Sequence, residues 1–562
     1  MNAAEVIVGS LEKDGVQYIF GIPGGAIEPL NNALYTSTIK VIVTKLEQGA
    51  AFMADGYARV SGNVGVCCST AGPGATNLIT GTASSFADSI PVITLTGQVS
   101  TSLFGKGAVQ EFSIQSFSIV SIFRQISKYS DIIINENKAG EMIAKARRLA
   151  LSGRKGPVHL NLPADIMKRK VADEHHRKFS TAQVMGFDRE AVKEAAKLLL
   201  SAKKPVIVAG WGTVLSRADI ELLELAELMD IPVATSPKAK GILSESHPLS
   251  LGVLGFAGSP TAKEYIIKRD VDVMLAVGTS FNEWVTPGWD KKLLPTKSMI
   301  QIDIDCNEIG KNYYVNTGIA GDAKTVLREL IYELRRNNKR KKLRDDRCKD
   351  IQAIKESLKV NPKKLDKMPY HPERMIMDLA EAVPEETLYF VDSGNCMAWA
   401  IRYLNIERPY SFFVGLGFAS MGFAVAASIG AKLAAGDKPV IALVGDGSFL
   451  MNGTEVATAV NYNIPVIWVV MNNSMFGMVH HGRKLAGIPE GITSSFKPVD
   501  FVKFAEGCGA RGIRITKPGE INKEMMDEII STGVPTVLDV IIDPEEVPPI
   551  HSRIATLEKL YT

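Results

Sequence analysis

The sequence predicts an α/β fold made of three doubly wound parallel-sheet domains. Short apolar runs rich in Val and Ile recur along the whole chain, and helix-length segments separate them. Runs that are apolar at nearly every position are typical of strands buried on both faces, as in parallel sheets covered by helices. A chain of 562 residues is also too long for one hydrophobic core, which favours several domains.

Thirteen apolar runs predict strands, taken in chain order. Most of them end in Gly, Asp, Ser or Asn, and in folds of this class ligands bind at the carboxyl ends of the strands. The runs occupy residues 16–22, 41–44, 64–70, 91–97 and 157–163, then 205–212, 232–236, 271–278 and 298–305, and finally 386–394, 439–447, 464–473 and 535–543.

Two polar stretches, residues 168–183 and 335–350, divide these runs into three groups. The second stretch is basic, and a nucleic-acid patch is one interpretation of it. It lacks aromatic residues and contains Asp345 and Asp346, so a solvated linker helix is favoured. The predicted domains are residues 1–167, 188–340 and 370–545, with a linker at 341–369 and a C-terminal tail at 546–562.

Composition argues against several classes of protein. The chain has 64 basic and 61 acidic residues, so it has no general attraction for nucleic acid or membrane surfaces. Its six cysteines lack CxxC spacing and its eight histidines lack metal-site spacing, which argues against a disulfide framework and a zinc site. The N-terminal sequence lacks signal-peptide features, and no apolar run is long enough to span a membrane. We therefore expect a cytoplasmic protein.

Two motifs in the last domain predict a metal-binding site. One run ends at Gly445–Asp446–Gly447 and the next ends at Asn472–Asn473, and residues 448–471 supply a helix and a strand between them. Parallel strands joined by one helix bring their carboxyl ends together. A carboxylate and an amide oxygen suit Mg²⁺, and the helix that Ser448 opens favours a phosphate anion. Taken singly, each motif is more often an ordinary strand-ending turn than a metal site.

With this spacing the chain resembles the thiamine diphosphate (ThDP) enzymes, whose motif is GDG, an intervening helix and strand, and NN. The first domain strengthens the resemblance, because "IPGG", "EQGAA", "GPGATN", "DSIP" and "GQV" follow one another as in the acetolactate synthase group of that family. The resemblance runs from residue 1 to about 545, in the order pyrimidine, central and diphosphate domain. It implies the ThDP-binding fold, the cofactors thiamine diphosphate and Mg²⁺, and decarboxylation of a 2-oxo acid such as pyruvate with carboligation to an acceptor.

The resemblance also implies roles for individual residues. Asp446, Asn473 and the main-chain carbonyl of Met475 would hold the metal. Glu47 would act in catalysis through a hydrogen bond to N1′ of the aminopyrimidine, and Gln110 would line the substrate side. The implied cofactor-binding residues are Pro23, Gly24, Gly74, Asn77, Asn395, Cys396, Met421, Gly445, Asp446, Gly447, Ser448, Asn473, Met475, Phe476, Gly477 and Met478. The implied substrate pocket comprises Gly25, Phe104, Gln110, Met478 and His481.

Simpler interpretations exist for several of these residues. Glu47 opens a helix, where the dipole alone favours an acid. Met421 would suit an apolar helix without a ligand, and Gln110 would suit a polar surface. The stretch VGLGFASMG (414–422) suggests a dinucleotide-binding glycine motif, but Ser420 replaces its third glycine and no acidic residue follows at the expected distance.

Several positions depart from the family's pattern. Leu46 stands where the family usually has His, and His480–His481–Gly482 stand where it has Arg-Gln-Trp, which opens room for a different or larger substrate. In the central domain, VGTSFNEW (277–284) replaces the Arg-Phe-Asp-Asp-Arg type sequence of FAD-containing members. LGVLGFAGS (251–259) and IDIDCNEIGKN (302–312) do follow the FAD-type pattern. FAD is therefore left open, with the balance slightly against it.

Asn395–Cys396 take the place of a Gln-His pair on the diphosphate side, and a thiol is a weaker hydrogen-bond donor than imidazole. In this family the pyrimidine domain of one subunit meets the diphosphate domain of another. The resemblance thus implies a homo-oligomer, dimer or tetramer, with active sites between subunits. The sequence does not reveal whether a regulatory subunit binds.

Alternative functions are a ThDP-dependent 2-oxo acid decarboxylase, an acyl-transferring lyase, and a non-catalytic ThDP-binding regulator. The presence of Glu47, Asp446 and Asn473 together argues against the last, because a regulator needs no catalytic acid.

Overall fold

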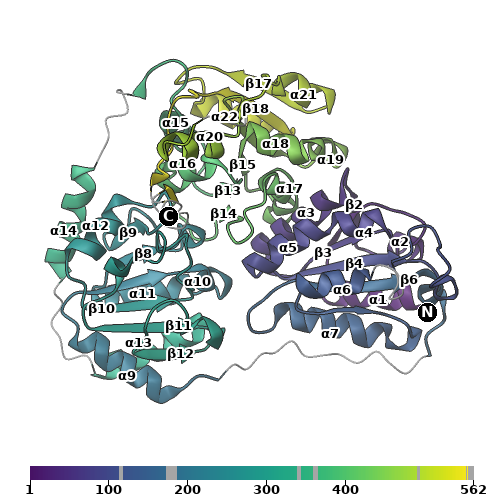
Figure 1. Cartoon of the computed structure of the whole chain (residues 1–562), viewed down its shortest axis with the longest axis horizontal. Helices are drawn as coiled ribbons and strands as arrows, with labels where there is room; N and C mark the ends of the chain where they lie inside the picture. The colour runs from purple at the N-terminus through teal and green to yellow at the C-terminus, as the bar shows by residue number, and fades with distance from the viewer. Residues whose placement is uncertain are drawn as a thin grey trace.

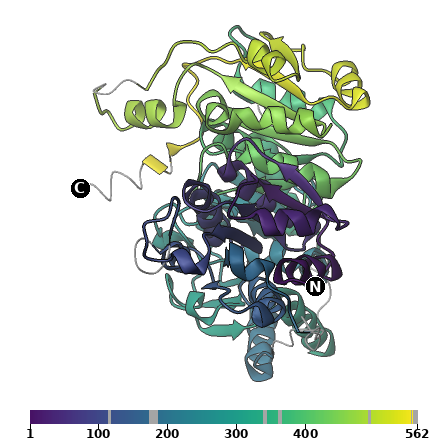
Figure 2. The ribbon, with the colours of Figure 1, turned by 90° about the vertical axis from the view of Figure 1, so that its right-hand side faces the viewer.

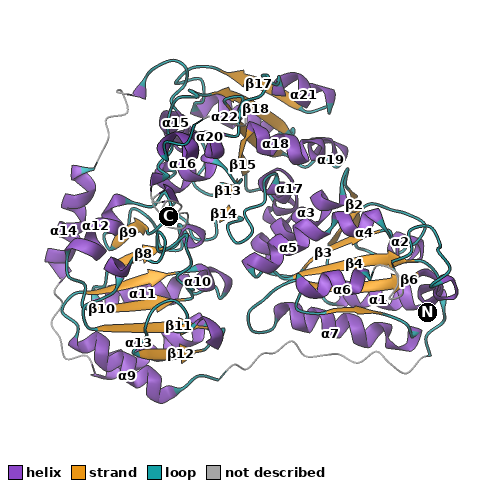
Figure 3. Cartoon of the chain, in the orientation of Figure 1, coloured by secondary structure: helices purple, strands orange, loops and turns teal. Residues whose placement is uncertain are grey.

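A computed structural model contains three sheets of six parallel strands, each covered by helices (Figures 1 and 3). It describes residues 1–112, 118–172, 186–337, 344–358, 365–489, 494–551 and 553–554. The prediction of three doubly wound parallel-sheet domains is confirmed. Figure 2 presents the N-terminal domain toward the viewer, with the C-terminal domain above it.

The strands pair in parallel within each sheet, and all thirteen predicted runs form strands. The N-terminal sheet has the order β2-β1-β3-β4-β6-β5 and contains β1 (Tyr18–Gly21), β2 (Lys40–Val43), β3 (Gly65–Ser69), β4 (Val92–Gln98), β5 (Ser130–Ile132) and β6 (Val158–Pro163). The central sheet, β12-β11-β10-β7-β8-β9, contains β7 (Pro205–Ala209), β8 (Val233–Thr235), β9 (Ser250–Val253), β10 (Val273–Val277), β11 (Ser298–Asp303) and β12 (Thr317–Ala320). The C-terminal sheet, β14-β13-β15-β16-β18-β17, contains β13 (Leu388–Val391), β14 (Phe412–Val414), β15 (Val440–Gly445), β16 (Val466–Asn472), β17 (Arg511–Ile515) and β18 (Thr536–Ile541).

Helices connect the strands and cover the sheets. The N-terminal domain has α1 (Ala3–Lys13), α2 (Glu28–Tyr35), α3 (Glu47–Ser61), α4 (Pro73–Asn77), α5 (Ile79–Asp88), α6 (Ile119–Gln125), α7 (Ala139–Leu151) and α8 (Ala164–Lys168). The central domain has α9 (Arg189–Ser201), α10 (Trp211–Leu215), α11 (Asp219–Met229), α12 (Pro260–Lys268) and α13 (Ala323–Asn337), followed by α14 (Arg344–Ser357). The C-terminal domain has α15 (Pro372–Ala382), α16 (Asn395–Tyr403), α17 (Phe423–Ala435), α18 (Asp446–Asn452), α19 (Val456–Asn461), α20 (Gly477–Leu485), α21 (Phe501–Gly507) and α22 (Lys523–Thr532).

The core lies where the sequence is most uniformly apolar. Strands β4 and β16 are buried at every position, as expected for strands covered on both faces. The predicted linker contains α14, whereas its residues 341–343 and 359–364, and residues 555–562 of the tail, lie outside the described residues. Arg335, in the basic stretch, lies in the last turn of α13 and pairs with Glu224. Within the described ranges, we find no helix with the length and apolarity needed to cross a membrane.

The two outer domains have the same topology. Counted in chain order within each domain, both sheets run second, first, third, fourth, sixth and fifth strand. Helices α3 and α17 each follow the second strand, and they pack directly against one another (Figure 1). The contact is reciprocal, because a Cβ on Gly56 would overlap the carbonyl of Ala427 and a Cβ on Gly430 would overlap that of Met53. Glycine at both positions therefore permits this close approach.

A buried charge cluster around Asp88 joins the three domains. The Asp88 carboxylate accepts hydrogen bonds from Arg59 in the N-terminal domain and Lys238 in the central domain, each at 2.9 Å. It also accepts from the backbone N–H of Gly417 in the C-terminal domain at 2.8 Å. Arg59 additionally donates to Asp55, so two carboxylates balance two cations. Although burial opposes ionisation, Lys238 and Arg59 hold the pKa of Asp88 below its ordinary value.

Replacing Asp88 by Ala should lower the free energy of unfolding by about 3–5 kcal/mol, because Lys238 would lose this carboxylate partner and Arg59 would keep only Asp55. Urea unfolding followed by tryptophan fluorescence measures this loss. Glu385→Ala is the control, since it breaks an exposed 3.0 Å ion pair with Arg408 and should cost less than about 1 kcal/mol. Equal losses in the two variants would contradict a structural role for the cluster.

Candidate active site

A cavity of about 240 Å³ lies at the carboxyl ends of β15 and β16. These strands are neighbours in register, with Gly445 opposite Met471, so the residues that follow each strand meet at one edge of the sheet. The N-termini of α16, α18 and α20 all reach the cavity wall. Twelve of the residues expected at the cofactor line it, namely Asn395, Cys396, Met421, Gly445, Asp446, Gly447, Ser448, Asn473, Met475, Phe476, Gly477 and Met478.

Asp446 is the charged side chain of this cavity. It is 1% exposed, and its carboxylate accepts hydrogen bonds from the backbone N–H groups of Gly447, Asn473 and Ser474. Burial raises the pKa of Asp446 to about 6. Among the described residues no cationic side chain pairs with it, so a cation is the partner that this carboxylate lacks.

The cavity fits a metal ion held together with a diphosphate. Three helix N-termini that converge on one cavity favour an anion, and the Asp446 carboxylate favours a cation beside it. The predicted metal ligands need only one carboxylate, since Asn473 and the Met475 carbonyl would supply amide oxygens. The described residues contain no group of three His, Cys, Asp or Glu side chains arranged for a metal.

His481 lies behind the cavity and does not line it. Its side chain is buried, with Nε2 2.9 Å from the Pro544 carbonyl and Nδ1 2.8 Å from Nδ2 of Asn395. Nε2–H therefore donates to Pro544, and Nδ1 accepts from the Asn395 amide. Burial lowers the pKa of His481, which keeps the ring neutral in this arrangement. The side-chain oxygen of Asn395, Oδ1, is buried at the cavity wall and has no hydrogen-bond partner among the described residues.

Sequence reasoning missed further residues of this cavity, and one residue that organises it. Asp392, at the end of β13, is fully buried and accepts from the N–H groups of Ser393, Gly422 and Ala424, so it fixes the turn that carries Met421. An aspartate that ends an apolar run was the available signal. The missed lining residues are Ser393, Gly394, Ala419, Met471, Val479 and Ile542.

A second group of the expected residues gathers at the carboxyl edge of the N-terminal sheet. Glu47 is the first residue of α3 and is 7% exposed. The Asn77 side-chain amide donates to the Glu47 carboxylate at 2.9 Å. A Cβ added to Gly74 would lie 3.0 Å from Oε1 of Glu47. Gln110 is exposed and has a φ of +63°. A Cβ added to Gly72 would lie 2.8 Å from the Cβ of Gln110. These residues thus form one surface around Glu47.

The remaining expected residues of the N-terminal domain follow β1 and β4. Pro23 and Gly25 are exposed, Gly24 lies against Thr70, and Phe104 is half-buried. All described residues that line the cavity around Asp446 come from the C-terminal domain. Within one chain, therefore, the group around Glu47 and the cavity around Asp446 are separate surfaces.

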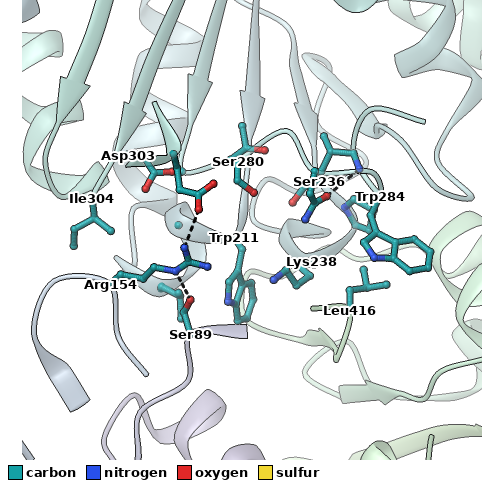
Figure 4. Close-up of a pocket in the computed structure, with 18 residues that line it drawn as sticks. Ser89, Arg154, Trp211, Ser236, Lys238, Ser280, Trp284, Asp303, Ile304 and Leu416 are labelled. Atoms are coloured by element: carbon teal, nitrogen blue, oxygen red, sulfur yellow. Dashed lines mark hydrogen bonds and ion pairs between the residues drawn. The ribbon is translucent and has the colours of Figure 1, made fainter. Parts of the chain in front are cut away.

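A smaller cavity of about 100 Å³ lies at the switch point of the central sheet, where β7 and β10 are neighbours (Figure 4). Trp211 and Lys238 line it, and the Trp211 Nε1–H donates to the Asp88 carbonyl at 2.8 Å. Arg154 enters from the N-terminal domain and is bound by Ser89 and Glu308, each at 3.0 Å. An adjoining hollow measures about 70 Å³.

Two of the three stretches considered for FAD border this cavity. Residues 277–284 contribute Gly278, Thr279 and Ser280, and residues 302–312 contribute Asp303, whose pKa is raised to about 6 by burial. Residues 251–259 contribute no lining residue.

Three protein-family models match the chain in sequence. The N-terminal TPP binding domain of thiamine pyrophosphate enzymes matches residues 1–117, their central domain matches residues 192–330, and their C-terminal TPP binding domain matches residues 392–540. The three ranges fall on the three sheets.

Several relatives match nearly the whole chain in sequence. The probable acetolactate synthase large subunit of Methanocaldococcus jannaschii is 40% identical, over 98% of this chain and 93% of the relative. The protein of the same name from Methanococcus aeolicus is 38% identical, over 97% and 92%. The acetolactate synthase large subunit of Corynebacterium glutamicum is 34% identical, over 96% and 87%. The chain therefore belongs to the thiamine pyrophosphate enzymes, in the group that includes the acetolactate synthase large subunits.

Proposed function

We propose that the protein is a ThDP- and Mg²⁺-dependent enzyme that decarboxylates pyruvate and joins the remaining two-carbon unit to a second 2-oxo acid, as an acetolactate synthase. The observation that carries the proposal is the cavity in which Asp446 and Asn473 follow neighbouring strands below three helix N-termini. Relatives named acetolactate synthase large subunits, of whose length the chain covers 93% and 87%, support the choice of reaction.

Each group of residues has one task in this proposal. Bound thiamine diphosphate supplies the electron sink for decarboxylation. Asp446, Asn473 and the Met475 carbonyl hold Mg²⁺, and the helix N-termini at the cavity wall bind the diphosphate. Met421 packs beside the cofactor. Glu47 holds and returns the proton at N1′ of the aminopyrimidine, and Asn77 orients its carboxylate.

The proposal includes a site shared between two copies of the chain. Glu47 and Gln110 lie on the N-terminal domain, whereas the cavity around Asp446 is built by the C-terminal domain alone. A second chain that brings its Glu47 surface to this cavity would complete the site. Because the relatives are named large subunits, a further and different subunit is also part of the proposal.

Incubation of the purified protein with pyruvate, ThDP and Mg²⁺, followed by product identification, tests the reaction. We expect release of CO₂ and formation of 2-acetolactate, both lost when Mg²⁺ is chelated. Release of CO₂ without a carbon–carbon bond would replace the carboligase by a decarboxylase. Absence of both products would refute pyruvate as the substrate.

A second candidate is a ThDP-dependent decarboxylase or acyl-transferring lyase with a larger substrate. It is favoured by Gly482, which stands where the family has a tryptophan. Among the described residues, a Cβ at this position would come within 4 Å of the Ile554 side chain alone, at 3.6 Å. Offering a panel of larger 2-oxo acids together with pyruvate distinguishes the candidates by the ratio of their kcat/KM values.

We further propose that the enzyme contains no resident flavin. The central cavity of about 100 Å³ falls below the roughly 300–1,000 Å³ of clefts that hold sizeable ligands, and Trp211 occupies its wall, held by Asp88. Thr279 and Ser280 stand in the stretch that carries arginines in FAD-containing members. The purified protein should show no flavin absorption in the visible range. A flavin band that survives gel filtration would contradict this prediction.

A further inference from the structure

The turn that carries Glu47 has no cap of its own. Strand β2 is an edge strand, and the chain passes through Thr44, Lys45 and Leu46 before α3 begins at Glu47. Leu46 is the N-cap residue, and its apolar side chain makes no capping hydrogen bond. The backbone N–H groups of Lys45 and Leu46, just before the helix, are partly buried and need an acceptor from elsewhere in the fold.

Glu455 of the C-terminal domain supplies the missing acceptors. Its Oε1 accepts from the Leu46 N–H at 2.9 Å and from the Lys45 N–H at 3.1 Å, while Oε2 lies 3.2 Å from the Lys45 nitrogen. The side chain is fully buried, and the Thr458 hydroxyl donates to Oε2 at 2.6 Å. Glu455 therefore has one fixed orientation, and that orientation defines the turn.

Two neighbouring contacts show that the two domains are fitted to one another here. A Cβ on Gly49 would overlap Oε1 of Glu455, so the third residue of α3 leaves the space that the carboxylate needs. The Tyr462 hydroxyl, about two helical turns after Glu455, accepts from the Val43 N–H at 2.9 Å. The end of β2 and the start of α3 are thus held by side chains from residues 455–462.

We propose that Glu455 is a positioning residue for Glu47, resting on the role assigned to Glu47 in the proposed function. Glu455 does not reach the cofactor. It fixes the backbone immediately before Glu47, and so sets where the Glu47 carboxylate meets its proton partner. Catalytic groups must be held to within about 0.5 Å of their working position, and a misplacement of about 1 Å costs on the order of 100-fold in rate.

The hydrogen-bond pattern predicts how substitutions will behave. In Glu455→Gln the carbonyl can occupy the Oε1 position and keep both backbone bonds, while the amide donates to Thr458. Glu455→Ala removes every acceptor. In Gly49→Ala, Glu455 stays in the chain and is displaced by the new methyl group, which provides a second test if Glu455→Ala does not fold.

The decisive measurement is the rate of hydrogen–deuterium exchange at C2 of bound ThDP, read by NMR after acid quenching. This rate reports activation of the cofactor without any 2-oxo acid, so it is informative even if pyruvate is not the substrate. We expect exchange about 10- to 100-fold slower in Glu455→Ala and slower in Gly49→Ala, with near wild-type exchange in Glu455→Gln. In turnover, kcat should fall in the first two variants while KM changes little.

Asp188→Ala is the matched control, because Asp188 likewise accepts two backbone N–H groups at a helix start, in the central domain. It should lose stability of about 1 kcal/mol without slowing exchange. Wild-type exchange in a folded Glu455→Ala or Gly49→Ala protein would overturn the proposal. So would exchange that is equally slow in Glu455→Gln, since the charge rather than the backbone bonds would then matter. If wild-type exchange itself requires no Glu47, the proposed function fails instead.

Discussion

Replacing Glu47 by Gln should lower turnover by about 10²- to 10⁴-fold while ThDP remains bound. A glutamine has the same shape and can still contact Asn77, but it cannot take up and return a proton. The loss should therefore fall on kcat and on C2 exchange rather than on cofactor affinity. Single-turnover kinetics together with ThDP titration separate these quantities.

Glu28→Gln is a suitable control for that experiment, because Glu28 is also the first residue of a helix in the same domain and is exposed. It should leave turnover unchanged. Full activity in Glu47→Gln would show that this carboxylate is only a helix-terminal acid. Loss of ThDP binding would show that its role is to hold the cofactor.

Replacing Asp446 by Ala should weaken Mg²⁺ binding by more than about 100-fold, since even partners behind a metal ligand are worth 10- to 100-fold. The cofactor should be lost with the metal, because the cavity would no longer offset the charge of the diphosphate. The rise in unfolding temperature on adding Mg²⁺ and ThDP measures this, and it should disappear in the variant. An unchanged rise would exclude Asp446 as a metal ligand.

The two inactive variants also test whether the site is shared. If Glu47 of one chain serves the cavity of another, then mixed dimers of Glu47→Gln and Asp446→Ala chains contain one intact site each. Random reassociation should restore about a quarter of wild-type activity, since half of the dimers are mixed and each has one of two sites. If both residues served one site within their own chain, mixing would restore nothing.

The strands that the sequence predicts and those that it misses differ in their position in the sheets. The five unpredicted strands, β5, β9, β12, β14 and β17, all lie at sheet edges. An edge strand has one neighbour and is short or partly exposed, so it lacks the long apolar run that reveals a central strand. β12 alternates buried and exposed positions, and β17 is buried at only one of its five.

The residues of the candidate site also fall into those that the sequence could reveal and those that it could not. Asp446 and Asn473 could be found because each directly follows a strand, and parallel neighbours place such residues together. Asp88 and Glu455 could not, because their partners lie far away along the chain and depend on how the domains meet. A buried acid has no local pattern that distinguishes it from an exposed one. The position of His481, behind the cavity, depends likewise on its contact with Pro544.

The reciprocal contact of α3 with α17 gives the chain a local two-fold symmetry between two domains of one topology. This is the symmetry of an isologous homodimer, here realised within a single polypeptide. The two halves have nevertheless diverged in chemistry. The C-terminal domain has Asp446 after its third strand, whereas the N-terminal domain has Thr70 in that region, and only the N-terminal domain begins its α3 equivalent with an acid. In the proposed function these two modules of one topology therefore have different tasks, one holding the cofactor and the other moving a proton, so that neither would work alone.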